Sequence, residues 1–263
     1  MKRPLSLLVL AVASQAAFAA NDPWSAPFTL QLGAFNADAE THVRLDATSA
    51  QRGTELSLES DLGVQKTKTL PDFYFVWRIN PRHAIEGEWL TLERSGSRVI
   101  TGQVDFGDAT FPINTSVNTT FDSNIFRVAY RYSPINEGGN GLGFLLGLHY
   151  TQIDTSIAGQ AGNVSDSASV DVPLPTLGIR GAVKFADNWR LTGFGQILKL
   201  KVGDYDGELY NVSAAVEWAF MPNAYVGLGY KYYDYRLTSE KGNARGKFEY
   251  KFDGPALYGA WTF

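Results

Sequence analysis

Three histidines are the starting points for acid–base chemistry in this chain. Hydrolases place a histidine beside a serine or a carboxylate. His42 lies among acidic residues, His83 follows the turn sequence Asn80-Pro81-Arg82, and His149 stands two positions before Thr151. A grouping of His149 with Ser213 and Glu217 is conceivable, but the segments that carry them are not expected to be neighbours. No G-x-S-x-G elbow or H-E-x-x-H zinc motif is present, so the sequence predicts no catalytic residue and a protein that is not an enzyme.

The chain offers little for a metal or a cofactor. It contains no cysteine, which excludes thiolate ligands and disulfides. Asp105 and Asp108 lie close together, but their spacing matches no calcium-binding loop. We therefore expect no metal and no cofactor. The 23 basic and 27 acidic residues are mixed along the chain, which also predicts no nucleic-acid partner.

The remaining candidates are charged side chains that alternate with apolar ones. In residues 124–132, Arg127 and Arg131 alternate with Phe126, Val128 and Tyr130. Residues 72–79, 176–185, 209–220 and 225–235 follow the same pattern. Alternation over such lengths predicts β-strands with one apolar and one polar face.

Two architectures fit such strands: a soluble sandwich, with its apolar face in the core, and a transmembrane barrel, with its apolar face in lipid. Several segments run for roughly 10–15 residues, longer than the roughly 5–6 of an average globular strand. Aromatic residues lie near the expected turns, as in the belts of membrane proteins; they include Trp77, Trp89, Trp189, Trp218 and Trp261. These features favour an all-β, transmembrane, antiparallel up-and-down barrel.

Connections of alternating length set the number of strands. We expect about ten, near residues 27–37, 70–80, 83–95, 119–133, 142–155, 173–186, 188–203, 206–220, 224–238 and 246–263. Eight or twelve remain open, the latter if residues 53–64 and 97–111 form a further hairpin. Long outer loops are expected over 37–69, 95–119, 155–172 and 238–246. Lys199 and Lys201 share the parity of Trp189, so a bulge is expected within the seventh strand.

The first residues indicate export. Lys2 and Arg3 precede a short apolar stretch, and Ala17 and Ala19 fit a cleavage site. The stretch is well short of the ~20 residues that span a membrane. Residues 1–19 are therefore predicted to be a secretory signal peptide cleaved near Ala19, and residues 20–263 to form one outer-membrane barrel domain.

The last strand ends on aromatic residues without a polar tail: Leu257-x-Gly259-x-Trp261-x-Phe263. Together with the signal peptide and the amphipathic strands, this ending resembles that of small bacterial outer-membrane barrels of the opacity-protein and outer-membrane-protein-W kind. The resemblance implies that Leu257, Trp261 and Phe263 form a signal for the barrel-assembly machinery, and that the last strand pairs with the first. Pro255 and Gly259 depart from that pattern. The expected surroundings are outer-membrane lipid and lipopolysaccharide, and the expected state is a monomer.

The polar faces would line a narrow lumen. The charged residues on that parity are Arg78, Glu86, Glu88, Arg127, Arg131, Arg180, Lys184, Glu217 and Lys231. They form either a salt-bridged plug or a thin path for small solutes, and the excess of basic residues predicts a preference for anions. The sequence thus predicts a structural barrel or a narrow channel. A loop-based adhesin, with residues 101–120 and 155–171 on the surface, and a lipid-modifying enzyme are the alternatives.

Overall fold

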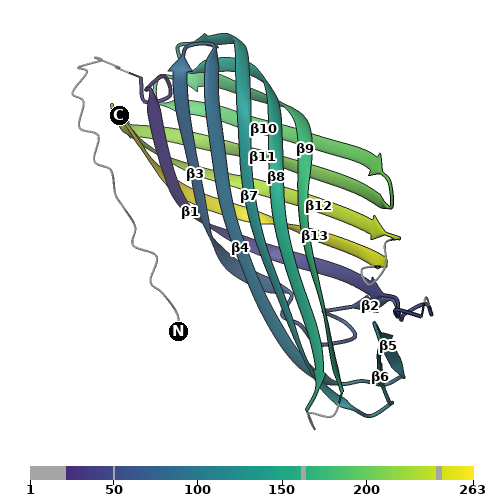
Figure 1. The fold of residues 1–263 in the computed structure, drawn as a ribbon. Helices are drawn as coiled ribbons and strands as arrows, with labels where there is room; N and C mark the ends of the chain where they lie inside the picture. Colours follow the sequence, from purple (N-terminus) through teal and green to yellow (C-terminus); the bar gives the residue numbers. More distant parts are fainter. Residues whose placement is uncertain (1–21, 50, 161–163, 241–244) are drawn as a thin grey trace, which may run out of the picture.

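The computed structural model describes residues 22–49, 51–160, 164–240 and 245–263. Ten long strands form a closed antiparallel barrel in which each strand pairs with the next (Figure 1). They are β1 (Phe28–Leu45), β3 (Thr67–Asn80), β4 (His83–Val99), β7 (Ser116–Glu137), β8 (Asn140–Gly159), β9 (Ser165–Ala186), β10 (Trp189–Val202), β11 (Tyr205–Met221), β12 (Ala224–Ser239) and β13 (Gly246–Thr262). The predicted fold and the count of ten are confirmed. The expected signal peptide lies outside the described residues.

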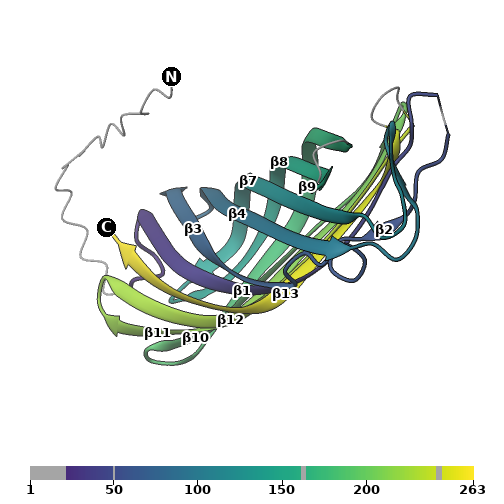
Figure 2. The ribbon, with the colours of Figure 1, turned by 90° about the horizontal axis from the view of Figure 1, so that it is seen from below.

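The first and last strands close the ring (Figure 2). β13 pairs with β1 from Thr262↔Thr29 to Gly246↔Leu45. Beyond the last strand residue, the Phe263 amide donates to the Phe28 carbonyl over 3.1 Å, and the Phe28 amide donates to the Phe263 carbonyl over 2.9 Å. The backbone of the aromatic C-terminus is therefore paired with β1, while the side chains of Trp261 and Phe263 are exposed.

The two ends of the barrel differ. The near end, which carries Asp22 and Phe263, has short turns at 81–82, 187–188 and 222–223, as predicted. The expected connection Ser133–Gly141 is tighter than predicted, because β7 continues to Glu137 and β8 begins at Asn140, so that only Gly138 and Gly139 form the turn. Both glycines have positive φ, 58° and 83°, which a two-residue hairpin requires.

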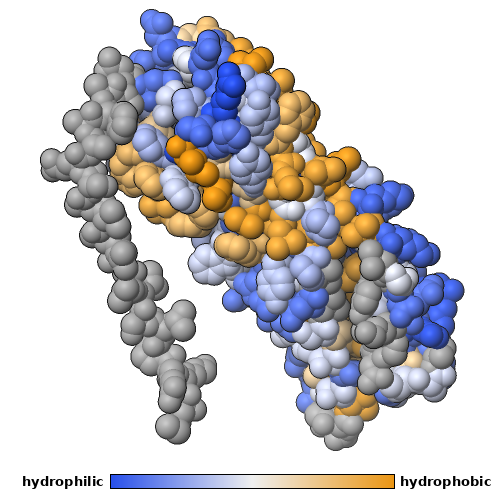
Figure 3. Space-filling view, turned by 45° about the horizontal axis from the view of Figure 1, so that its top comes forward, coloured by the Kyte–Doolittle hydropathy of each residue, from blue (hydrophilic) through white to orange (hydrophobic). Residues whose placement is uncertain are grey.

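The polarity of both faces reverses halfway along the strands. In the near half, the outward side chains of β7 and β8 are exposed and apolar, from Phe126 to Tyr132 and from Leu142 to Tyr150. In the far half the same parity carries polar residues, among them Asp122 and Asp154. A hydrophobic band accordingly lies between hydrophilic regions (Figure 3).

Inward side chains show the opposite order. The near half encloses buried polar residues such as Arg127 and His149, whereas the far half encloses Phe121, Ile125 and Ile153 in a large apolar core. In its near half each strand thus has the apolar outer face of a membrane-spanning strand. In its far half it has a polar outer face and an apolar inner face, as in a water-exposed β-sheet. No helix in the described part of the chain is long and apolar enough to cross a membrane.

This reversal corrects the predicted loops. Much of 37–69, 95–119 and 155–172 is strand, because β1 continues to Leu45, β7 starts at Ser116, and β8 and β9 flank a short connection at 160–164. Part of 238–246 lies outside the described residues. The hairpin of 53–64 with 97–111 does not form within the described chain. In the described structure those residues contain β2 (Leu56–Ser57), the end of β4 up to Val99, β5 (Val104–Phe106) and β6 (Ala109–Phe111), and among these elements only β5 and β6 pair with each other.

The prediction of a bulge within β10 is also wrong. β10 pairs with β11 in one register from Trp189↔Trp218 to Val202↔Tyr205. Lys199 and Lys201 keep the outward parity and are exposed, because this part of the strand lies beyond the apolar band. Lys199 forms an ion pair with Glu208, its partner on β11.

The barrel wall separates between β9 and β10 in the far half. Their pairing ends at Leu177↔Ile197, while β9 continues to pair with β8 as far as Ser165, and Figure 1 shows the two strands diverging. Pro173 and Pro175 lie directly beyond the last pair. Because proline has no N–H to donate, it is compatible with an unpaired edge. A cavity of ≈ 260 Å³ in the far half is lined in part by Ile153, Ser167 and Phe248, from β8, β9 and β13.

Candidate functional site

A network of buried charges fills the lumen of the near half, and Arg127 of β7 is its centre. Arg127 is fully buried. Its Nε donates to Glu88 Oε2 on β4 over 3.0 Å, and its Nη1 donates to Gln196 Oε1 on β10 over 3.2 Å. The guanidinium also lies over the rings of Phe194 and Tyr74, at 5.0 and 5.7 Å from their centroids. One side chain therefore links both walls of the barrel.

Glu86 is shared by several cations. Its Oε1 accepts a hydrogen bond from Arg131 Nη1 at 2.5 Å and lies 3.3 Å from Arg180 Nε. Its Oε2 lies 3.8 Å from Arg127 Nη1. Because β4 pairs with β7, the even-numbered residues of β4 point inward opposite the odd-numbered arginines of β7.

Lys231 of β12 bridges two further carboxylates. Its Nζ donates to Asp72 Oδ2 over 2.6 Å and to Glu88 Oε1 over 2.7 Å. Asp72 was not among the predicted lumen charges, although it shares the parity of Arg78 on the same strand. That parity is the signal that could have found it.

A second, smaller group lies nearer the turns. Glu217 accepts hydrogen bonds from Arg190 Nε at 2.7 Å and from the Tyr258 hydroxyl at 2.8 Å. Arg190 is a further lumen residue that the sequence reasoning missed. The ammonium of Lys184 lies 5.8 Å from the centre of the Trp24 ring.

Arg78 has no carboxylate partner among the described residues. Its Nη1 donates to the Ala26 carbonyl and to Thr29 Oγ1, both at 2.8 Å. All nine predicted lumen charges thus point into the near half of the barrel, and most of them join the two groups. Across the lumen, cations outnumber carboxylates.

His149 makes no hydrogen bond to Ser213 or Glu217 in the described structure. His149 is buried on β8 opposite Arg127, and neither ring nitrogen has a hydrogen-bond partner within the described structure. Ser213 and Glu217 belong to β11, which β9 and β10 separate from β8. His83 lies at the near-end turn beside Tyr130.

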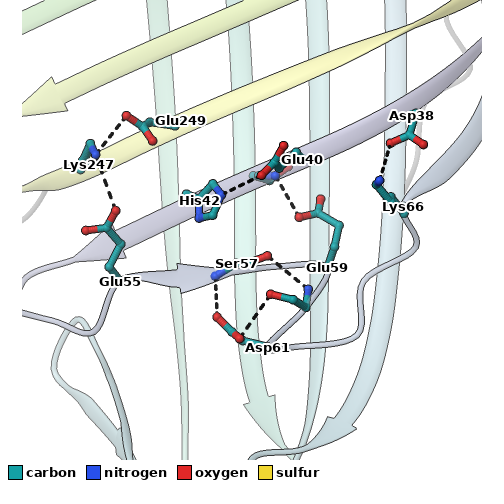
Figure 4. Close-up of polar contacts among 12 residues, drawn as sticks. Asp38, Glu40, His42, Glu55, Ser57, Glu59, Asp61, Lys66, Lys247 and Glu249 are labelled. Carbon is teal, nitrogen blue, oxygen red and sulfur yellow. Dashed lines mark hydrogen bonds and ion pairs between the residues drawn. The ribbon is translucent and has the colours of Figure 1, made fainter.

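His42 lies in β1 rather than in a loop, among exposed polar pairs of the far end (Figure 4). Its Nε2 lies 3.4 Å from Glu40 Oε1. Nearby, Lys247 forms ion pairs with both Glu55 and Glu249. Within the described residues, no group of three or more histidine and carboxylate side chains is placed to hold a metal ion.

An apolar core lies in the lumen beyond the charges. It includes inward side chains of the strands, such as Phe121 and Phe252, and side chains of the far-end connections, such as Leu58, Leu62 and Phe111. All five are almost completely buried. Ion pairs thus occupy the lumen in the near half, and an apolar core occupies it in the far half.

No protein-family model matches the chain, and no curated protein matches it. Among solved structures, it is similar to the outer membrane protease OmpT from Escherichia coli, with a TM-score of 0.61 and 12% identity over 90% of this chain and 96% of that chain. OprG from Pseudomonas aeruginosa matches with a TM-score of 0.39 and 11% identity over 92% of this chain and 98% of that chain. At these identities the similarity to OmpT concerns the fold alone.

The chain has the fold of outer-membrane β-barrels, with ten strands. Its near end, with the short turns and both ends of the described chain, is the periplasmic end in such barrels. No family within this class is assigned, so the resemblance to the opacity-protein and outer-membrane-protein-W kind holds only for the class.

Proposed function

We propose that this protein is a non-conducting, non-enzymatic barrel that stabilises the outer membrane and supports a rigid outer surface. The carrying observation is the burial of Arg127 between Glu88 and Gln196, on opposite walls of the lumen. An ion that crossed this layer would have to displace a buried partner, and breaking a buried ion pair costs about 3–5 kcal/mol. The apolar core of the far half adds a second barrier in series.

The test is conductance of the refolded protein in a planar bilayer over a range of salt concentrations. We expect no discrete current steps from the wild-type barrel. A matched variant, Lys199→Gln, changes a cation outside the lumen and should be equally silent. Regular steps that increase with salt concentration would refute the proposal, and their selectivity would then show whether the excess of lumen cations favours anions.

A second candidate function, recognition at the cell surface, is favoured by the far half of the barrel. On β7, the stretch from Ser116 to Phe126 extends ~33 Å along the strand beyond the apolar band. Its outward face is polar and its interior is packed, so it is suited to hold the far-end connections in fixed positions. Binding of whole cells to immobilised host glycans, lost on deletion of residues 101–113, would favour this adhesin-like role over the structural one.

The remaining features of the proposal are an environment of outer-membrane lipid and lipopolysaccharide, assembly by the barrel-assembly machinery, and a monomeric state. A lipid-modifying enzyme is the least favoured alternative. It requires turnover of a lipid A substrate that is lost in a folded His149→Ala variant.

A further inference from the structure

A cavity opens at the periplasmic end of the lumen, and part of its lining is formed by charges of the network around Arg127. Its accessible volume is ≈ 90 Å³, several times the minimum of about 10–15 Å³ that holds one water molecule. Asn136 and Asn140, beside the β7–β8 turn, lie at its rim. Trp24 covers it from the segment that precedes β1, with 3% of its surface exposed.

The lining of this cavity carries an excess of positive charge. The cations are Arg78, Arg131, Arg180, Arg190 and Lys231, and the carboxylates are Glu88 and Glu217. Both carboxylates already have cationic partners, as described above. Arg131 and Arg180 share one oxygen of Glu86, and Arg78 has no carboxylate among the described residues.

Four buried N–H groups on the lining have no hydrogen-bond acceptor in the described structure: Trp24 Nε1, Arg78 Nε, Arg131 Nε and Arg180 Nε. Of these, Arg180 Nε lies 3.3 Å from Glu86 Oε1 as an ion pair without a hydrogen bond. Arg131 is 8% exposed. Buried donors of this kind are rarely left without an acceptor. The free-energy cost of burial without a partner is larger for a charged group than for a neutral one. The lining therefore lacks negative charge and hydrogen-bond acceptors together, which is what a small anion supplies.

We propose that the periplasmic cavity binds a small oxyanion, such as inorganic phosphate or sulfate. Guanidinium groups bind the oxygens of phosphate and carboxylate through short, charge-assisted hydrogen bonds. Arg78 and Arg131 donate to the anion from β3 and β7, and Trp24 Nε1 donates from the covering segment. The anion enters from the periplasmic rim and needs no path through the lumen.

Equilibrium dialysis of refolded barrel against radiolabelled phosphate, at constant ionic strength and with unlabelled sulfate as competitor, tests the site. We expect saturable binding of one anion per barrel. Arg78→Gln should weaken it about ten-fold or more, since one charge-assisted bond is lost. Trp24→Phe keeps the aromatic cover but removes the indole donor, and should weaken binding by a smaller factor.

Lys199→Gln removes an exposed cation outside the barrel and is the control, expected to bind as the wild type does. The mobility of unboiled samples on gels shows which variants are folded. If Arg78→Gln does not fold, phosphate binding by the Trp24→Phe variant tests the proposal instead. Absence of saturable binding to the wild type, or wild-type affinity in a folded cavity variant, would overturn the proposal. Either result leaves the conductance test unaffected.

Discussion

Replacing Lys231 by methionine tests whether the charge network stabilises the barrel. Lys231 is the only ion-pair partner of Asp72 in the described structure and one of two partners of Glu88. Met has a similar length but no charge, so the variant leaves Asp72 buried and unpaired. Removing one partner of a buried pair typically costs about 3–5 kcal/mol, and we expect a loss of that order in the free energy of unfolding.

A double variant separates the charge from the packing. Lys231→Met combined with Asp72→Asn leaves no unpaired carboxylate at position 72, and should recover at least half of the loss. The matched control is Lys199→Met, which removes an exposed pair with Glu208 and should cost about 0.2–1 kcal/mol. Urea unfolding in phospholipid vesicles, followed by tryptophan fluorescence, measures all of these values. The reasoning fails if Lys231→Met costs no more than Lys199→Met, or if the double variant is as unstable as the single one.

Three other predictions concern the chain end, the wall and the far-end loops. Deletion of Phe263 should lower the yield of assembled barrel in the outer membrane, and an unchanged yield would argue against an assembly signal. Replacing Pro173 and Pro175 with valine restores two N–H donors and should extend the β9–β10 pairing; amide exchange over 198–202 should slow, and unaltered exchange would mean that the prolines do not define the edge. Thr48 donates to Asp108 through both its amide and its hydroxyl, and these bonds lower the pKa of Asp108. The stabilising contact is therefore present above the ordinary aspartate pKa and lost as pH falls through the lowered one, so the Thr48 amide shift in NMR should titrate below the ordinary value; a titration at or above it would contradict the assignment.

The near half of the barrel could be predicted well, because its physical chemistry is simple. Lipid outside and charges inside produce strict alternation, which set the strand count and the parity of all nine lumen residues. Asp72 and Arg190 share that parity, so the same alternation could have identified them. The partners across the lumen could not be predicted in this way, since they depend on which strands face each other. Arg127 reaches Gln196, 69 residues further along the chain, and no local pattern encodes that contact.

The far half was predicted poorly, for a reason visible in β10. Lys199 shares the parity of Trp189, and this pattern predicts a change of face, but what changes is the medium around the barrel. Beyond the apolar band the outward face meets water, so it becomes polar, and the inward face becomes apolar to form a core. The same reversal made the outer part of β9, with Ser167, Ser169 and Asp171, look like a loop.

The reversal also means that different forces hold the two halves. The far half buries Phe121, Ile153 and Phe252 in a core like that of a soluble protein, where the hydrophobic effect acts because water surrounds the outer face. In the near half lipid removes that driving force between the walls, so the backbone hydrogen bonds of the closed ring and the ion pairs of the lumen remain. Transfer from bilayer to detergent changes only the medium around the near half. The far half is therefore expected to keep its amide protection in either environment, while the stability of the Arg127 layer depends on how well the surrounding amphiphile excludes water.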